Sequence, residues 1–289
     1  MSSVQPLSLN PSFPFLRKWW PVLAGLMLLY LPTYYDLSQT IWTKEEYIHS
    51  PMVLVASLWL FWRQRETLLE PPQNTRPVMG GILLGFGLLL YAIGRSQEIL
   101  LFEVGSQIPV ILGTLFIAFG GNAARAFWFP LFFLVFMIPL PGFIVDSMTG
   151  PLKQKISVLA ENTLYAMGYP IARQGVVLTI GSYQLLVADA CSGLHSMFSL
   201  SAIGLLYLYL LHYASRLKNA LLIASILPIA FFANVIRVII LVLVTYHFGD
   251  EAGQGFLHKF AGIILFVVAL TLLFIFDAFF DMALKKKPA

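Results

Sequence analysis

The sequence predicts an all-α polytopic membrane protein with about eight transmembrane helices, plus an outer amphipathic helix and a short β-hairpin. Three observations support this fold class. Hydrophobic residues make up 58% of the 289 residues and charged residues only 11%, whereas soluble domains carry about 25% charged residues. The apolar residues gather in runs close to the length of about 20 that crosses a bilayer. The basic residues lie mostly at the ends of these runs.

The apolar runs give the candidate spans in chain order. They cover residues 19–37, 49–62, 78–94, 99–120, 126–140, 192–213, 218–247 and 255–281. The second run is short. The seventh is too long for one straight crossing and contains Pro228, so a kink is expected there. No small-residue cleavage site follows the first run, which predicts a retained helix rather than a signal peptide.

The distribution of basic residues predicts the orientation. An even number of spans puts both termini on one side of the membrane. Eleven of the 18 Lys and Arg residues fall on that side, all close to span ends: Arg17, Lys18, Arg63, Arg65, Arg76, Arg125, Arg216, Lys218, Lys285, Lys286 and Lys287. The positive-inside rule makes this side cytoplasmic. The other side holds Lys44, Arg95, Lys153, Lys155, Arg173 and Lys259.

This topology divides the chain into five parts. They are a cytoplasmic tail (1–18), five helices (19–140), an outer segment (141–190), three helices (191–282) and a basic tail (283–289). The first half of the outer segment repeats apolar residues at helical spacing, which predicts an amphipathic helix. Its second half has two β-rich runs separated by Gly181-Ser182, which predicts a hairpin. The hairpin is expected outside the hydrocarbon, because open strand edges do not survive within it.

Four residues that could take part in chemistry converge on the outer interface. Cys191 begins the sixth span, His258 begins the eighth, and His49 opens the second. Arg237 lies 19 residues beyond Lys218, or about 28 Å at a rise of 1.5 Å per residue. The hydrocarbon is about 30 Å thick, so Arg237 is also expected near the outer boundary.

The residues around Cys191 suit an activated nucleophile. A thiolate is the reactive form of cysteine, and a nearby cation or a helix N-terminus stabilises it. Cys191 is expected at the start of a helix, with Arg237 and His258 at the same depth. His258 is the natural general base. Backbone amides of the first turn, near Ser192 and Gly193, could hold an oxyanion.

Each residue also has a structural interpretation. A lone cysteine in a membrane helix can be a small apolar filler, and Arg237 can be an interfacial arginine extending to the headgroups. An ionisable residue within a span nevertheless favours function. Asn234 can join helices by hydrogen bonds. Asp189 can cap the sixth span, orient His258 or pair with Arg237. His258 can be an interfacial histidine without a role, and His49 can line the site or cap the second span.

Other classes remain open at this point. A rhomboid protease needs Gly-x-Ser-Gly, which Ala190-Cys191-Ser192-Gly193 does not provide. A CaaX-type membrane protease needs Glu-Glu-x-x-x-Arg, and Ser50 occupies the arginine position after Glu45-Glu46. A transporter is expected to carry polar groups at mid-membrane rather than at one edge. A polytopic transporter or a scaffold protein is the alternative function. The single cysteine excludes an internal disulfide and a Cys-based metal cluster.

Three blocks of the sequence resemble the exosortase/archaeosortase family. They are Val187-Ala188-Asp189-Ala190-Cys191-Ser192-Gly193-Leu194, then Asn234-x-x-Arg237, then Phe256-x-His258. His49-Ser50-Pro51 matches the place of an N-terminal histidine motif, and the resemblance covers about residues 40–282. Asp189 departs from the usual glutamate. The stretch from Ala188 to Phe198 is similar to the exosortase B branch.

The resemblance implies a cysteine protease and transpeptidase of the bacterial inner membrane. Such enzymes process exported proteins with a PEP-CTERM tail, which has a Pro-Glu-Pro motif, a hydrophobic helix and a basic cluster. Cys191 is then the nucleophile, through a thioester, Arg237 the stabilising cation and His258 the proton-transfer group. Asp189, Asn234, His49, Ser192 and Gly193 are candidate supporting residues. The implied partners are the substrates, membrane lipid and an unidentified acceptor that could be exopolysaccharide-linked. No cofactor, metal or nucleic acid is expected.

Overall fold

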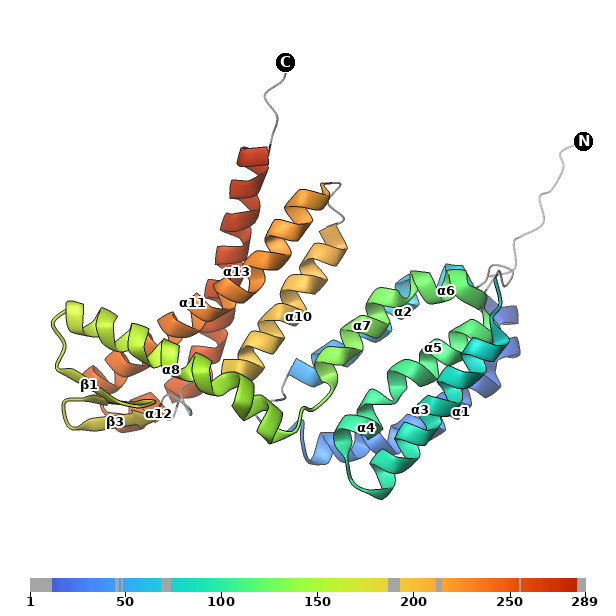
Figure 1. The fold of residues 1–289 in the computed structure, drawn as a ribbon, viewed down its shortest axis with the longest axis horizontal. Helices are drawn as coiled ribbons and strands as arrows, with labels where there is room; N and C mark the ends of the chain where they lie inside the picture. Colours follow the sequence, from blue (N-terminus) through green and yellow to red (C-terminus); the bar gives the residue numbers. More distant parts are fainter. Residues whose placement is uncertain are drawn as a thin grey trace, which may run out of the picture. The chain divides into compact units, whose positions relative to one another are not determined.

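The computed structural model describes residues 12–44, 47, 49–68, 74–186, 193–211, 215–254 and 256–284, which are mostly helical (Figure 1). Contacts divide the chain into two compact units, Met1–Pro139 and Leu140–Ala289. Each unit has buried apolar clusters of its own.

The first unit is built from helices. They are α1 (Ser12–Gln39), α2 (His49–Arg63), η2 (Arg65–Leu68), α3 (Pro77–Ser96), α4 (Leu100–Gly105), α5 (Gln107–Ala118), α6 (Gly120–Ala126), α7 (Trp128–Phe133) and η3 (Leu134–Met137). A buried cluster in this unit surrounds Phe127, which is fully buried and stacks on Phe61 with the ring centroids 5.0 Å apart. This cluster ties α2 to the segment from α5 to α7.

Helices α3 and α5 approach closely through glycines. Gly80, Gly87 and Gly94 are the buried residues of α3, spaced seven apart, so they share one helix face. A Cβ atom on Gly87 would lie 2.6 Å from Cγ2 of Val110, and one on Gly80 would lie 2.8 Å from the carbonyl oxygen of Gly113. Small residues permit this backbone approach, which is typical of membrane helices.

The second unit combines long helices with a small sheet. Its elements are α8 (Gly142–Ala166), β1 (Ile171–Gln174), β2 (Val177–Ile180), β3 (Tyr183–Leu186), α10 (Gly193–Leu211), α11 (Arg216–Phe248), α12 (Asp250–Gln254) and α13 (Phe256–Leu284). The strands are antiparallel in the order β1-β2-β3, with Ile171 opposite Ile180 and Val177 opposite Leu186. Gly181 has φ +57° in the turn between β2 and β3, a conformation that glycine adopts without strain.

Helix α8 presents one apolar face to the sheet and α11. Ile156, Ala160 and Leu164 are buried at intervals of four residues, so they line one side of the helix. They pack with Leu178 of β2 and with residues of α11. Met167 continues the helical spacing of apolar residues in the sequence, but it is 57% exposed just beyond the helix end.

Three helices in the described part of the chain are long and apolar enough to cross a membrane. They are Pro77–Ser96, Leu100–Ala118 (α4 and α5 together) and Leu217–Phe248 within α11. A fourth crossing is formed if Gly120–Ala126 and Trp128–Met137, which meet at a bend of 55°, are counted as one span. The protein is therefore a helical membrane protein, and the total of eight spans stays a prediction.

Candidate active site

Arg237 lies within α11, the helix around which the second unit is organised. This helix packs against α8, α10, α12, α13 and β3. Its start is capped by Ser215, whose side-chain oxygen accepts a hydrogen bond from the backbone N–H of Lys218 at 3.3 Å. Arg237 is only 5% exposed, which is unusual for a charged side chain and favours a specific role for it.

The position of Arg237 is fixed by packing on both sides along the helix. Ala233, one turn before Arg237, and Ala230, two turns before it, belong to the core shared with α10 and α13. Val238 and Leu241 belong instead to the core shared with α8 and the sheet. One apolar core gives way to the other between Ala233 and Val235, so Arg237 lies just beyond this point, and the packing of both cores sets its depth.

Asn234 precedes Arg237 by one helical turn and is 1% exposed. Its amide nitrogen and oxygen form no hydrogen bond with any residue in the described ranges. A buried amide without partners is costly, since each lost hydrogen bond leaves a desolvated polar group. Both atoms can therefore form hydrogen bonds with a ligand, or with residues outside those ranges.

The structure describes the other catalytic candidates only in part. Asp189, Cys191 and Ser192 lie outside the described residues, between the end of β3 at Leu186 and the start of α10 at Gly193. His258 lies in the first turn of α13, and its side chain is outside the described part.

An ion pair sets the register between α11 and α13. Lys218 Nζ lies 2.7 Å from Asp277 Oδ1 and 2.6 Å from Asp281 Oδ1. The two helices are antiparallel neighbours (Figure 1). A residue a given number of positions after Lys218 on α11 therefore lies level with the residue the same number of positions before Asp277 or Asp281 on α13. Arg237 lies 19 residues after Lys218, so it is level with residues 258 and 262, which lie 19 residues before Asp277 and Asp281. Arg237 and the first turns of α13 therefore lie at one depth.

A hydrogen bond sets the register of α10 against α13 in the same way. Tyr207 donates its hydroxyl to Asp277 Oδ2 at 3.0 Å. These helices run in the same direction (Figure 1), so Gly193, 14 residues before Tyr207, matches residue 263 of α13. Arg237, residue 258 of α13 and the start of α10 thus agree in depth to within about 8 Å along the helix axes.

The contacts of Lys218 were not foreseen from the sequence. The topology used Lys218 and Asp281 only to mark span ends, and Asp277 was not considered. Lys218 is 4% exposed in its side chain and Asp277 is 13% exposed, so this ion pair is largely desolvated. Oppositely charged residues at the same predicted end of two spans were the signal that could have revealed it.

His49 lies in the first unit. It is the first residue of α2, and its Nε2 is 3.2 Å from the carbonyl oxygen of Phe136 in η3. Cys191, Arg237 and His258 belong to the second unit. The contact observed for His49 thus fastens the start of α2 to η3 within its own unit.

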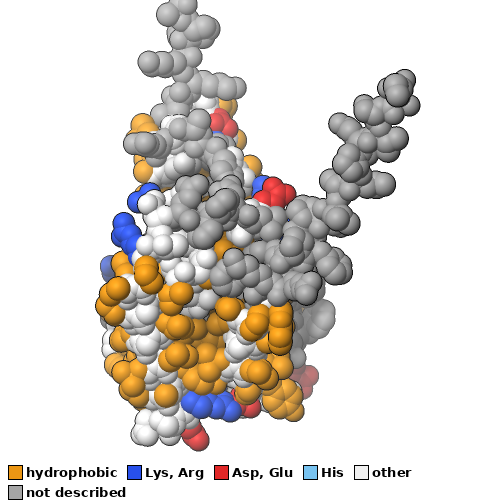
Figure 2. Space-filling view, turned by 90° about the vertical axis from the view of Figure 1, so that its right-hand side faces the viewer, with side chains coloured by type: hydrophobic (Ala, Val, Ile, Leu, Met, Phe, Trp, Pro, Cys, Tyr) orange, Lys and Arg blue, Asp and Glu red, His pale blue; other side chains and the backbone are white. Residues whose placement is uncertain are grey.

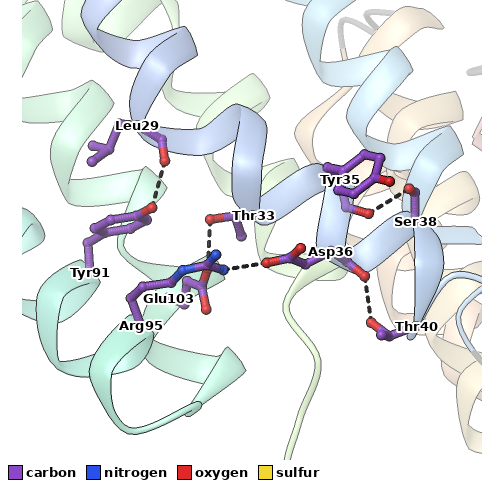
Figure 3. Close-up of polar contacts among 9 residues, drawn as sticks. All are labelled: Leu29, Thr33, Tyr35, Asp36, Ser38, Thr40, Tyr91, Arg95 and Glu103. Atoms are coloured by element: carbon purple, nitrogen blue, oxygen red, sulfur yellow. Dashed lines mark hydrogen bonds and ion pairs between the residues drawn. The ribbon is translucent and has the colours of Figure 1, made fainter.

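A polar network in the first unit was also missed by the sequence analysis (Figure 3). Arg95 Nη1 lies between Asp36 Oδ2 at 2.6 Å and Glu103 Oε1 at 3.0 Å. Thr33 donates to the same Glu103 oxygen at 2.7 Å, and Glu103 is 3% exposed. An acidic residue inside an apolar run needs a partner, so Glu103 in the predicted span 99–120 could have pointed to Arg95.

The structure contains no metal-binding arrangement that can be recognised within the described ranges. No group of three or more His, Cys, Asp or Glu side chains there is placed to hold a metal ion.

Comparison with known proteins gives one match. The model of a family described as transmembrane exosortase (Exosortase_EpsH) matches residues 41–275. No curated protein and no solved structure matches the chain. The matched range contains Cys191, Arg237 and His258, and it covers most of both units.

Proposed function

The chain belongs to the transmembrane exosortase family, and on that premise we propose that it is a membrane-embedded cysteine protease and transpeptidase. Its proposed substrates are exported proteins with a PEP-CTERM tail, and its proposed nucleophile is Cys191. Family membership implies a sorting protease or transpeptidase in general. The tail, the thioester and the residue roles are the specific content of the proposal.

The agreement in depth between the three helices is the observation that carries the proposal. Two independent contacts, Lys218 with Asp277 and Tyr207 with Asp277, relate α10 and α11 to α13. The first contact puts Arg237 close to the level at which α13 begins, and the second puts the start of α10 close to the same level. Cys191 precedes α10 by two residues, and His258 belongs to the first turn of α13. A buried cation at this level supports thiolate chemistry there.

The proposed reaction has two covalent steps. The Sγ thiolate of Cys191 attacks the carbonyl carbon of the scissile peptide bond, forming a C–S bond. The C–N bond then breaks as His258 gives its proton to the leaving amine. The N-terminal part of the substrate is left as a thioester on Cys191. An acceptor nucleophile or water attacks this thioester, loses its proton to His258 and releases the thiolate.

Arg237 and Asn234 suit the charges that develop in these steps. A guanidinium can stabilise the thiolate, or hold the oxyanion through its fork of N–H donors. The Asn234 amide is buried one turn away and can donate to the same oxygen or to the substrate backbone. The backbone N–H of Gly193 is a further donor candidate. Asp189 is a candidate to orient His258, while Ser192 and His49 remain candidate supporting residues.

The proposal includes a location. The enzyme is expected in the bacterial inner membrane, with both termini in the cytoplasm and the site at the periplasmic face. A substrate whose hydrophobic tail helix lies in the bilayer presents the preceding Pro-Glu-Pro motif at that face. The cleavage position and Cys191 then lie at the same depth without any part of the substrate being extracted from the membrane.

Co-expression with a tagged PEP-CTERM protein tests the proposal. The wild type is expected to shift the substrate to a shorter form on a gel, whereas Cys191→Ala at equal membrane abundance leaves it at full length. Arg237→Gln is tested in the same assay. Its matched control is Arg173→Gln, which also removes a basic residue, because Arg173 pairs with Glu161 in the sheet region. Undiminished processing by Cys191→Ala would overturn the nucleophile assignment. Substrate export that depends on Arg237 but not on Cys191 would instead support a transporter or scaffold.

A further inference from the structure

A small pocket in the first unit is lined by two arginines. Asn74, Arg76, Phe116, Gly121, Asn122 and Arg125 enclose a cavity of about 90 Å³. This is room for a compact anion such as a phosphate group, and too little for a nucleoside. No Asp or Glu lines the pocket, so its walls carry two positive charges and no negative one.

The arginine side chains are available to a ligand. Arg76 and Arg125 are both exposed, and neither guanidinium makes a hydrogen bond or ion pair with a residue described in the structure. Guanidinium groups bind phosphate oxygens through paired N–H donors, and such charge-assisted bonds are stronger than neutral ones. Two of them around one small cavity form a binding site for a phosphate group.

The backbone around the pocket is held in place. The N–H of Gly121 donates to the carbonyl of Asn74 at 3.0 Å, and the N–H of Arg76 donates to the carbonyl of Phe116 at 3.4 Å. Asn74 has φ +54°, in the left-handed region that asparagine tolerates. These contacts join the segment before α3 to α5 and α6, so the pocket does not depend on side chains alone.

A shallow, largely open apolar groove lies beside the pocket along α3. It has a volume of about 650 Å³ and is lined by Arg76, Pro77, Val78, Met79, Ile82 and Leu83. Arg76 is shared by the two cavities. Val78 is 76% exposed and Ile82 is 68% exposed, although α3 is a candidate membrane span. This surface therefore faces lipid.

The opposite end of α3 provides a contrast. Arg95 near that end is neutralised by two carboxylates, Asp36 and Glu103. Arg76 and Arg95 are 19 residues apart, or about 28 Å, which is close to the hydrocarbon thickness. Figure 2 shows one face of the molecule, where hydrophobic side chains form a broad band with Lys and Arg side chains at its borders. Of the two arginines on this helix, Arg76 lies at the end predicted to be cytoplasmic, where anionic lipids concentrate.

We propose that this pocket and groove bind one anionic phospholipid, with its phosphate between Arg76 and Arg125 and an acyl chain along α3. Charge complementarity selects the headgroup, and the adjoining apolar groove selects a lipid over a free anion. A bound lipid of this kind would join the start of α3 to α6, and so stabilise the first unit. The proposal is independent of the chemistry at Cys191.

Thermal unfolding of the full-length protein in detergent tests the proposal with added lipid. Phosphatidylglycerol is expected to raise the Tm, whereas phosphatidylcholine with the same chains has a much smaller effect. In Arg76→Gln/Arg125→Gln the lipid concentration for half of the effect should rise at least about tenfold, because charge-assisted bonds of this strength are lost. Arg63→Gln/Arg65→Gln is the matched control: it removes two arginines that stack on Trp59 and Trp62 and should leave the lipid response unchanged.

The groove has its own pair of variants. Ile82→Ser should weaken the effect of phosphatidylglycerol, whereas Leu89→Ser, which alters a residue of similar exposure outside the groove, should not. Three outcomes would overturn the proposal. They are equal stabilisation by phosphatidylcholine, equal stabilisation by sodium phosphate alone, and equal loss of the lipid response in the two double-arginine variants.

Discussion

Lys218 Nζ lies 2.7 Å from Asp277 Oδ1, and this largely buried ion pair holds α11 and α13 in the register that brings Arg237 level with the first turns of α13. The same carboxylate accepts the hydroxyl of Tyr207 from α10. One residue, Asp277, therefore relates α11, which carries Arg237, α13, which includes residue 258, and α10, which starts two residues after Cys191.

Asp277→Asn is expected to destabilise the second unit by about 1–3 kcal/mol, because among the described residues it leaves the buried Lys218 ammonium with only the more exposed carboxylate of Asp281 as a charged partner. The control is Asp281→Asn, which alters a carboxylate that is 55% exposed and should cost about 0–1 kcal/mol. Unfolding in a mixed-micelle denaturation assay measures both. Equal losses for the two variants would contradict the assignment of Asp277 as the helix-joining residue.

Arg237→Gln is expected to lower the rate of substrate processing by about 10²–10³, the usual effect of removing one oxyanion donor. It should also move the pH profile of Cys191 alkylation to higher pH, because a nearby cation stabilises the thiolate. The chain has one cysteine, so any thiol-reactive probe reports that residue. Arg237→Lys should bring the pH dependence of Cys191 alkylation closer to that of the wild type than Arg237→Gln does, because lysine keeps the positive charge. It should restore less of the rate of substrate processing, because lysine lacks the paired N–H donors of the guanidinium. An unchanged alkylation profile in Arg237→Gln would assign Arg237 to packing.

Gly87→Ala is expected to destabilise the first unit by about 1–3 kcal/mol, as overpacked sites do. Its methyl group would lie 2.6 Å from Val110 Cγ2 and 2.8 Å from the Val110 backbone nitrogen. Gly85→Ala is the matched control on the same helix, because nothing lies within 4 Å of the added atom. Alanine also favours helix over glycine by about 1 kcal/mol, so Gly85→Ala should be neutral or stabilising. Thermal unfolding of both variants measures the change in stability. Comparable losses of stability in the two variants would contradict the close approach of α3 and α5.

Cys191 is expected to react with a membrane-impermeant maleimide in intact spheroplasts, because the site is proposed at the periplasmic face. The counterpart is Ser3→Cys in a Cys191→Ala background, which should react only after the membrane is opened. Mass-tag labelling followed by a gel reads out both. Labelling of Ser3→Cys from outside, with protection of Cys191, would reverse the proposed orientation.

Sequence patterns located the long helices well. The predicted spans 78–94 and 218–247 correspond to α3 (Pro77–Ser96) and α11 (Arg216–Phe248), because unbroken apolar runs leave few alternatives to a helix in lipid. The predicted span 99–120 is divided at Ser106 into α4 and α5. A hydropathy average does not detect such a break, because the break depends on local backbone geometry and not on the polarity of the side chains.

The sheet and the polar contacts were harder to predict. The run 177–186 reads as two strands, but β1 (Ile171–Gln174) has one strongly apolar residue and becomes a strand by pairing with β2. The heptad spacing of Gly80, Gly87 and Gly94 was readable in the sequence and was overlooked. The partners of Lys218 and Arg95 follow from tertiary packing, which a single sequence does not specify. Arg237 was identified as a candidate from its place in a span, but its position between two cores required the structure.

Trapping the acyl-enzyme tests the central claim most directly. The purified full-length protein is mixed with a tagged PEP-CTERM substrate, quenched in acid and analysed by peptide mass spectrometry with and without neutral hydroxylamine. The account predicts the N-terminal part of the substrate on the peptide containing Cys191, released by hydroxylamine and absent in Cys191→Ala. Cleavage of the substrate by Cys191→Ala, with no adduct on the wild-type cysteine, would contradict it.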